Sequence, residues 1–161
     1  MNSVATTFRV LAFMQNQWVR DPEQLRRILA RHDEDFRRRM IHKLLFAGCL
    51  TGRRIRAAFG DDLCRSIVWE EASREITGAS NGCPDADVEH MQAAFDQVKP
   101  DIVLTFGRLA ERGFMGVRGE YVWIKAPHPA SRDQFVTRQL AGAAMTLRET
   151  LAAPHSEGAG A

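Results

Sequence analysis

The sequence predicts a three-layer α/β/α sandwich built on a central, mainly parallel sheet of four strands. Two observations predict it: short apolar runs alternate with helical segments, and polar, turn-rich residues follow each apolar run. This alternation is typical of βαβ units, in which helices cover both faces of a parallel sheet. The length of 161 residues fits one domain. We expect that domain to span residues 1–153, followed by a disordered tail over residues 154–161.

The four strands are expected where β-forming apolar residues run together. These runs cover residues 8–14, 66–69, 101–106 and 121–125. Strands that are buried on both faces read as continuous apolar stretches, which favours a parallel sheet.

Helices are expected between the strands, where apolar residues recur at helical spacing. They cover residues 23–32, 33–46, 53–59, 85–98, 108–112 and 132–151. Asp21 followed by Pro22 is typical of a helix start, and Gly60 of a helix end. The stretch 74–84 is rich in Gly, Ser and Asn, which predicts a loop.

Composition excludes several classes of protein. Lys and Arg number 22 against 20 Asp and Glu, a net charge of +2, so a DNA-binding face must come from local clustering. No run approaches the roughly 18 apolar residues of a membrane span, and the N-terminus lacks a leader pattern. The three cysteines, Cys49, Cys64 and Cys83, are too dispersed for a disulfide scaffold, a zinc site or a four-cysteine cluster. We therefore expect a cytoplasmic protein without a membrane contact, a metal or a cofactor.

Ligand sites in open parallel sheets lie at the carboxyl ends of the strands. The segments to consider are 15–18, 70–73, 107–108 and 128–132. The sequence has no phosphate-binding glycine loop, no nucleophile elbow and no H-E-x-x-H pair. His128 stands between two prolines, which fix its backbone and therefore the direction of its ring. A neutral imidazole there can donate a hydrogen bond to the charge that develops on a leaving group.

Each of these residues also has a structural interpretation. His128 alone is as consistent with a structural or exposed histidine, and Asn16 with a turn residue at a strand end. Phe46 and Trp18 stack on a flat ligand in one interpretation and pack in the core in the other. The functional interpretation gains weight because these residues all fall at one edge of the sheet.

The order of the motifs resembles that of the uracil-DNA glycosylase superfamily. The matching segments are Met14 to Trp18 for the first motif, Phe46 to Gly48 for F-x-G, Phe106 to Ala110 for L-G-x-x-A and His128 to Arg132 for H-P-S-P. The order and approximate spacing of the motifs match the family over residues 8–145, nearly the whole chain. The first motif departs from the family pattern, because Met14 and Gln17 stand where the family has glycine and proline.

The resemblance implies a role for each matched residue. Asn16 positions the attacking water, and Gln15 contacts the base. Phe46 stacks on the base once it is flipped out of the helix, with Trp18 as a further aromatic. His128 stabilises the negative charge on the departing base.

The resemblance also implies that DNA is the partner. Arg132 would fill the space that the flipped base leaves, and Ser131 and Arg108 belong to the same matched motifs. Arg53, Arg54 and Arg56 follow Phe46 and lack nearby carboxylates, so we expect them to contact phosphates. The many other basic residues of the first third are equally explained as a solvated helix face.

The end of the second strand departs from the family in a way that affects specificity. Glu70 and Glu71 stand where the family commonly has an asparagine that reads uracil. A carboxylate only accepts hydrogen bonds, so it favours a base edge that carries an amino group. Successive side chains of a strand point to opposite faces, and Glu71 lies nearer the carboxyl end, so we expect Glu71 to read the base. The alternative is an ion pair with a nearby arginine.

The sequence therefore predicts a metal-free, monofunctional DNA glycosylase. It would flip out a non-standard or modified pyrimidine and hydrolyse its N-glycosidic bond, in DNA repair or phage defence. No lysine stands at a matched position, which favours attack by water over a Schiff-base lyase. We expect a monomer. The alternative is a catalytically altered nucleic-acid-binding or base-modification protein on the same fold.

Overall fold

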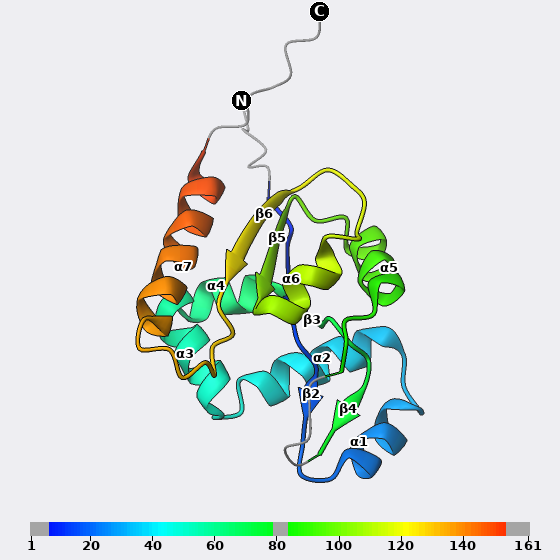
Figure 1. The fold of residues 1–161 in the computed structure, drawn as a ribbon. Helices are drawn as coiled ribbons and strands as arrows, with labels where there is room; N and C mark the ends of the chain where they lie inside the picture. The colour runs from blue at the N-terminus through cyan, green and yellow to red at the C-terminus, as the bar shows by residue number, and fades with distance from the viewer. Residues whose placement is uncertain (1–6, 79–83, 154–161) are drawn as a thin grey trace, which may run out of the picture.

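A parallel four-stranded sheet forms the centre of the computed structural model, which describes residues 7–78 and 84–153 (Figure 1). The strands are β1 (Val10–Met14), β3 (Val68–Glu71), β5 (Ile102–Phe106) and β6 (Val122–Ala126). Their order is β3-β1-β5-β6, and every neighbouring pair is parallel. The expected tail over 154–161 and Cys83 lie outside the described residues.

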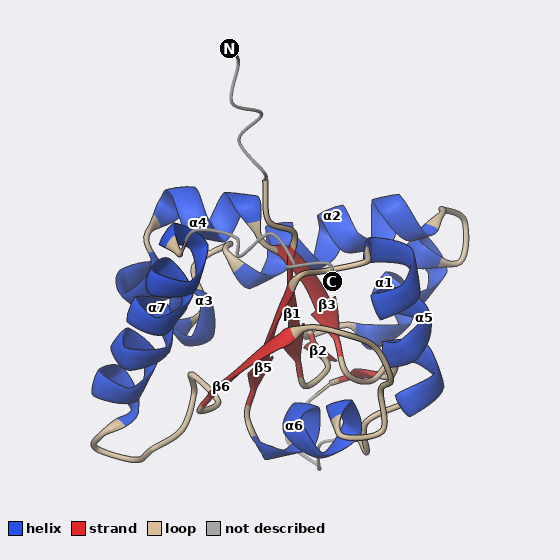
Figure 2. Ribbon diagram, turned by 90° about the horizontal axis from the view of Figure 1, so that it is seen from above, coloured by secondary structure: helices blue, strands red, loops and turns tan. Residues whose placement is uncertain are grey.

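Helices cover both faces of this sheet (Figure 2). The helices are α1 (Pro22–Leu29), α2 (Glu34–Leu45), α3 (Leu50–Phe59), α4 (Asp61–Ser66), α5 (Val88–Val98), α6 (Arg108–Phe114) and α7 (Val136–Ala152). Side chains of α2, α3, α4 and α7 share one hydrophobic core, and those of α5 and α6 share the other. The predicted α/β/α sandwich is therefore confirmed.

The alternation along β1 shows why its sequence reads as one apolar run. Ala12 and Met14 pack into the core of α3 and α7, and Leu11 and Phe13 pack into the core of α5 and α6. All five residues of β1 are buried, so neither face allows a polar residue.

Several boundaries differ from the sequence prediction. Helix α3 begins at Leu50 because the Cys49 sulfur accepts a hydrogen bond from the Gly52 N–H. Helix α5 is capped by Asp87, not by Asp85, because the Asp87 carboxylate accepts from the His90 N–H. Helix α7 begins at Val136, since the preceding residues form a hydrogen-bonded loop.

Three short elements were not predicted. Helix α4 follows α3 directly, with Gly60 between them. Strands β2 (Gln17–Trp18) and β4 (Ile76–Thr77) pair in parallel within what the sequence presents as turns. This pair ties the segment after β1 to the segment after β3.

The strand order places a topological switch between β1 and β5. The chain runs from β1 to β3 on one side and then crosses to β5 on the other side of β1. Loops that leave two such strands diverge, which opens a crevice at their carboxyl ends. No helix in residues 7–78 and 84–153 has the length and apolar character to span a membrane.

Candidate functional site

A cleft of about 900 Å³ opens at the carboxyl ends of β1, β5 and β6. Its lining includes Gln15, Gly107, Arg108, Lys125, His128 and Ser131. Three of the four segments that the sequence singled out therefore meet here, after β1, β5 and β6. The fourth, at the end of β3, does not line this cleft.

Gly107 allows two of these segments to approach each other. It joins β5 to α6 with a φ of +89°, and its N–H donates to the Ala126 carbonyl. A Cβ at this position would lie 3.0 Å from the His128 Cβ and 3.1 Å from the Gln15 Nε2. Glycine is thus required both by the backbone and by the space between Gln15 and His128.

We expect Gly107→Ala to lower the free energy of unfolding by about 1–3 kcal/mol, through backbone strain and crowding against His128. Chemical denaturation measures the loss. Gly142→Ala is the matched control, because a Cβ on Gly142 meets nothing within 4 Å. That control should keep or slightly raise the stability of α7. Equal stability of Gly107→Ala and the wild type would contradict the crowding argument.

His128 is held in a single hydrogen-bonding state. Its Nδ1 accepts a hydrogen bond from the Ala130 N–H at 3.2 Å, and its carbonyl accepts from the Ser131 N–H at 2.9 Å. A backbone N–H can only donate, so the proton of the neutral ring lies on Nε2. Burial lowers the pKa of His128 below its usual value of 6.5. The cleft is therefore lined by a neutral imidazole with an N–H to donate.

The two amides after β1 are placed differently. Gln15 lines the cleft beside Gly107. The Asn16 Nδ2 donates to the Thr77 Oγ1 at 2.8 Å, which ties it to β4. The lining of the cleft includes Gln15 and not Asn16, so the structure does not bring Asn16 and His128 together there.

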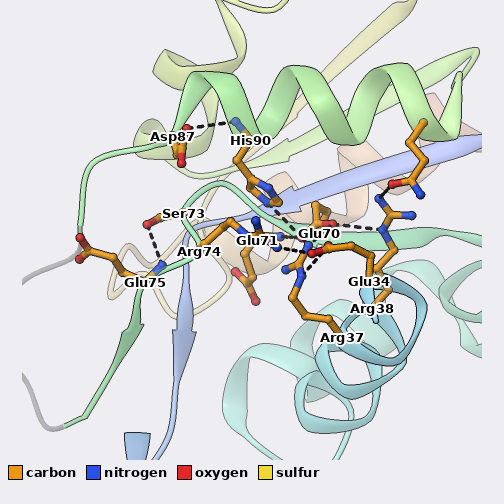
Figure 3. Close-up of polar contacts among 11 residues, drawn as sticks. Glu34, Arg37, Arg38, Glu70, Glu71, Ser73, Arg74, Glu75, Asp87 and His90 are labelled. Carbon is orange, nitrogen blue, oxygen red and sulfur yellow. Dashed lines mark hydrogen bonds and ion pairs between the residues drawn. The ribbon is translucent and has the colours of Figure 1, made fainter. Parts of the chain in front are cut away.

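Glu70 is fully buried inside a cage of basic side chains (Figure 3). Arg37 Nη2 donates to both carboxylate oxygens, at 2.8 and 2.7 Å, and Arg38 Nε donates to one at 3.2 Å. The His90 Nε2 lies 3.3 Å from the Glu70 Oε1. Burial alone would raise the pKa of Glu70, but His90, the Arg37 charge and the Glu71 N–H outweigh it and lower the pKa to about 2.

Glu71 points to the opposite face of the sheet from Glu70. Its side chain lines a small pocket of about 30 Å³ that is walled by apolar residues of α1 and α2. Its Oε2 has no hydrogen-bond partner among the residues that the structure describes. Burial and the neighbouring Glu70 charge raise the pKa of Glu71 to about 8, although Arg37 works in the other direction. At neutral pH Glu71 is mostly a protonated acid, not the acceptor-only carboxylate that the sequence argument requires.

The raised pKa of Glu71 predicts a specific dependence of stability on pH. Below the usual value of 4.5 this group is protonated in both the folded and the unfolded chain, so its burial carries no cost of excluding the charged form. As the pH rises from there through about 8, the wild type loses stability that Glu71→Gln keeps. We expect the variant to be about 1–3 kcal/mol more stable near pH 9 and no more stable near pH 4. Denaturant titrations across this range measure the difference. The exposed Glu75→Gln is the control, and a gap that does not change with pH would refute the prediction.

Of the two aromatic residues expected to contact the base, Phe46 does not line the cleft, and the side chain of Trp18 is not described by the structure. The Phe46 ring packs edge-on against Trp69, with centroids 5.4 Å apart, and the Arg56 guanidinium lies 5.3 Å from its centroid. Phe46 is thus half-buried at the margin of the core. The backbone of Trp18 pairs in β2, and its side chain is outside what the structure describes.

The residues expected to contact DNA have three different placements in the structure. Arg108 and Ser131 line the cleft, and Arg132 and Arg53 are exposed. Arg54 instead donates through Nη1 to the carbonyls of Pro129 and Ser131, at 2.6 and 3.0 Å.

Other basic residues of the first third form ion pairs. Arg37 and Arg38 bind Glu70, Arg26 binds Glu23, and Arg56 binds Asp61. The interpretation as a solvated helix face fits the exposed pairs of Arg26 and Arg56, although the sequence also predicts a phosphate contact for Arg56. It does not fit Arg37 and Arg38, which are largely buried against Glu70.

Sequence reasoning missed one charged pair in the cleft. Lys125 Nζ donates to Glu111 at 2.9 Å and lies 4.4 Å from the centroid of the Trp123 ring. The available signal was the position of Lys125 near the end of the fourth apolar run. Its partner, Glu111, lies in the first turn of α6, the helix that follows the neighbouring strand β5.

Within residues 7–78 and 84–153, no three His, Cys, Asp or Glu side chains are arranged to hold a metal ion. Comparison with models of known protein families gives no match to this chain, and comparison with curated proteins gives none.

Proposed function

We propose that this protein is a DNA glycosylase that releases a non-standard or modified pyrimidine by hydrolysis. The observation that carries the proposal is the fixed, neutral His128, which lines the cleft with an Nε2–H to donate. A departing pyrimidine carries negative charge on its carbonyl oxygens, and a preorganised donor stabilises that charge. The topological switch at β1 and β5 places this donor where α/β folds bind ligands.

In the proposed reaction the target base is flipped into the cleft, because its glycosidic bond is inaccessible within the duplex. The bond to C1′ breaks and its electron pair leaves with the base, while positive charge develops on the sugar. His128 donates a hydrogen bond to the base anion throughout. The oxygen of a water molecule bonds to C1′, and one of its protons ends on the released base. We assign this water to the amides that follow β1, which are Gln15 in the lining of the cleft and Asn16, the next residue in the chain.

The size of the cleft supports a base with a substituent. Its volume of about 900 Å³ and its open mouth leave room for a pyrimidine that carries a substituent. The sequence predicts that Glu70 or Glu71 selects a base edge with an amino group, but the structure gives no support for this selection. Neither Glu70 nor Glu71 lines this cleft, and both are engaged or buried elsewhere.

A panel of oligonucleotides tests the proposal. Single- and double-stranded substrates would carry uracil, hydroxymethylated, glycosylated or deaminated bases at one position, followed by treatment with alkali. We expect strand cleavage at one class of base, since alkali breaks DNA at an abasic site. Intact strands across the whole panel would refute glycosylase activity.

One observation favours a second candidate, a protein that binds DNA without hydrolysing it. The Asn16 amide is held by Thr77 and does not line the cleft that contains His128. If Asn16 does not position a water molecule, the protein binds a base without hydrolysing its glycosidic bond. Binding to an oligonucleotide of the panel, with no abasic product, would identify this case.

Either function requires contacts to phosphates. We expect Arg53→Ala and Arg132→Ala each to lower the slope of log affinity against log salt concentration by about one, because each exposed cation would release one counterion. Fluorescence anisotropy with a labelled oligonucleotide at several salt concentrations measures the slope. Arg65, exposed on α4 and paired with Asp62, provides the control. Unchanged slopes in both variants would remove Arg53 and Arg132 from the interface.

A further inference from the structure

Arg54 links α3 to the loop that carries His128. Its Nη1 donates to the Pro129 carbonyl at 2.6 Å and to the Ser131 carbonyl at 3.0 Å. The second carbonyl lies 77 residues along the chain. Arg54 is part-buried, so its charge is only partly screened by solvent.

The Pro129 carbonyl belongs to the same peptide group as the Ala130 N–H. One side of this rigid, planar group accepts from Arg54, and the other side donates to His128 Nδ1 at 3.2 Å. The position of the carbonyl therefore sets the direction of the N–H. A cation at the carbonyl also polarises the peptide and strengthens the N–H as a donor.

Arg54 also binds the far end of the turn formed by His128 to Ser131. The Ser131 N–H donates to the His128 carbonyl at 2.9 Å, and the Ser131 carbonyl accepts from Arg54. The peptide that faces the His128 ring is thus held at both of its flanks. Rotation of that peptide would break the contact with Nδ1 and one contact with Arg54 together.

We propose that Arg54 is a positioning residue, which fixes His128 in the tautomer with its proton on Nε2 by orienting the peptide group between Pro129 and Ala130. Its effect on base release rests on the proposed function, but its effect on the tautomer does not. This role differs from the phosphate contact that the sequence predicts for Arg54, because the guanidinium binds backbone carbonyls of the protein itself.

The other charged groups that line the cleft with His128 come from three elements. They are Arg108 and Glu111 from α6, Lys125 from β6 and Asp133 from the loop before α7. Helix α7 contributes the uncharged Gln139. Lys125 and Glu111 bind each other at 2.9 Å. The hydrogen bond that Nδ1 accepts comes from the Ala130 N–H and not from one of these side chains, within the part of the chain that the structure describes.

The tautomer can be read by NMR from the ring nitrogens, with the His128 signals identified by their loss in His128→Gln. In the wild type we expect one tautomer, protonated at Nε2, between about pH 6.5 and 8. In Arg54→Met, which keeps an apolar stem but has no donor, we expect a mixture with protonated Nδ1. Arg54→Lys restores one donor, and we expect it to recover part of the Nε2–H population.

Arg148→Ala is the matched control. Arg148 also donates to a backbone carbonyl, that of Phe59 at 2.7 Å, which lies at the end of α3 and not in the His128 loop. We expect this variant to lose stability without a change in the His128 tautomer. A wild-type His128 protonated at Nδ1 would overturn the proposal, a result that needs no variant to fold. A folded Arg54→Met with the wild-type tautomer would also overturn it.

Kinetics separate this proposal from the proposed function. If bases are released, Arg54→Met should lower kcat by about 10²-fold with little change in KM, the scale expected when a group is misplaced. A raised KM with a lower salt slope, and an unchanged kcat, would instead assign Arg54 to a phosphate contact and refute the positioning role. If the wild type releases no base, the glycosylase proposal fails, and the NMR result decides the role of Arg54 alone.

Discussion

An Arg37→Met variant will unfold with about 3–5 kcal/mol less free energy than the wild type at neutral pH, because it leaves a buried carboxylate without its main partner. Glu70 is fully buried, and Arg37 Nη2 donates to both of its oxygens. The fall in the pKa of Glu70 from 4.5 to about 2 corresponds to roughly 3 kcal/mol of favourable interaction. Arg38 and His90 remain in the variant, so the fold is expected to persist with lower stability.

The loss should depend on pH in a defined direction. Because the pKa of Glu70 is lowered in the folded state, its contribution is fully present above about 4.5 and is lost as the pH falls toward about 2. The denaturation curves of Arg37→Met and the wild type should therefore converge as the pH falls below 4.5.

Two further variants separate this interaction from a general effect on α2. Arg39→Met removes an exposed arginine from the same helix, and we expect a change within about 0.5 kcal/mol. Arg37→Met combined with Glu70→Gln should lose less than the sum of the single variants, since the buried charge is gone. Additive losses would show that Arg37 and Glu70 do not stabilise each other.

The cage around Glu70 also shows where the sequence is misleading. A pair of glutamates after an apolar run predicts the end of a strand, because charged residues are almost never fully buried unless paired. In the structure both residues belong to β3, and Glu70 is buried because two arginines of α2 reach it. The partners lie 32 and 33 residues earlier in the chain, and nothing in local spacing indicates that pairing.

Strands β1 and β5 could be predicted because each is a continuous apolar run that is buried throughout. Strands β3 and β6 could be predicted from shorter apolar runs, although β3 ends in two glutamates and β6 is partly exposed. The β2–β4 pair could not, since two residues per strand show no periodicity. Within the site, Gln15, Gly107 and His128 follow strands, and the parallel order of the strands brings such positions to one edge. The role of Arg54 depends on a contact across 75 residues, which only the folded chain reveals.

His128→Ala is expected to lower the turnover of base release by about 10²–10³-fold, the usual cost of losing one preorganised donor to a developing anion. The affinity for substrate DNA should change little, because we expect the exposed cations Arg53 and Arg132 to supply that binding. The measurement is single-turnover release of the base that the oligonucleotide panel identifies. His32→Ala is the control: His32 is exposed and stacks on Phe36 at the start of α2.

The pH dependence of the wild type gives a second measurement of the same step. Protonation of Nδ1 would put a second donor against the Ala130 N–H, so the turn that holds the ring would be disrupted. Since burial lowers the pKa of His128 below 6.5, we expect turnover to be constant above that value and to fall only at lower pH. In His128→Ala this fall should be absent. Wild-type turnover in His128→Ala would remove the residue from the mechanism. A pH profile that is the same with and without the imidazole would assign the titration to another group.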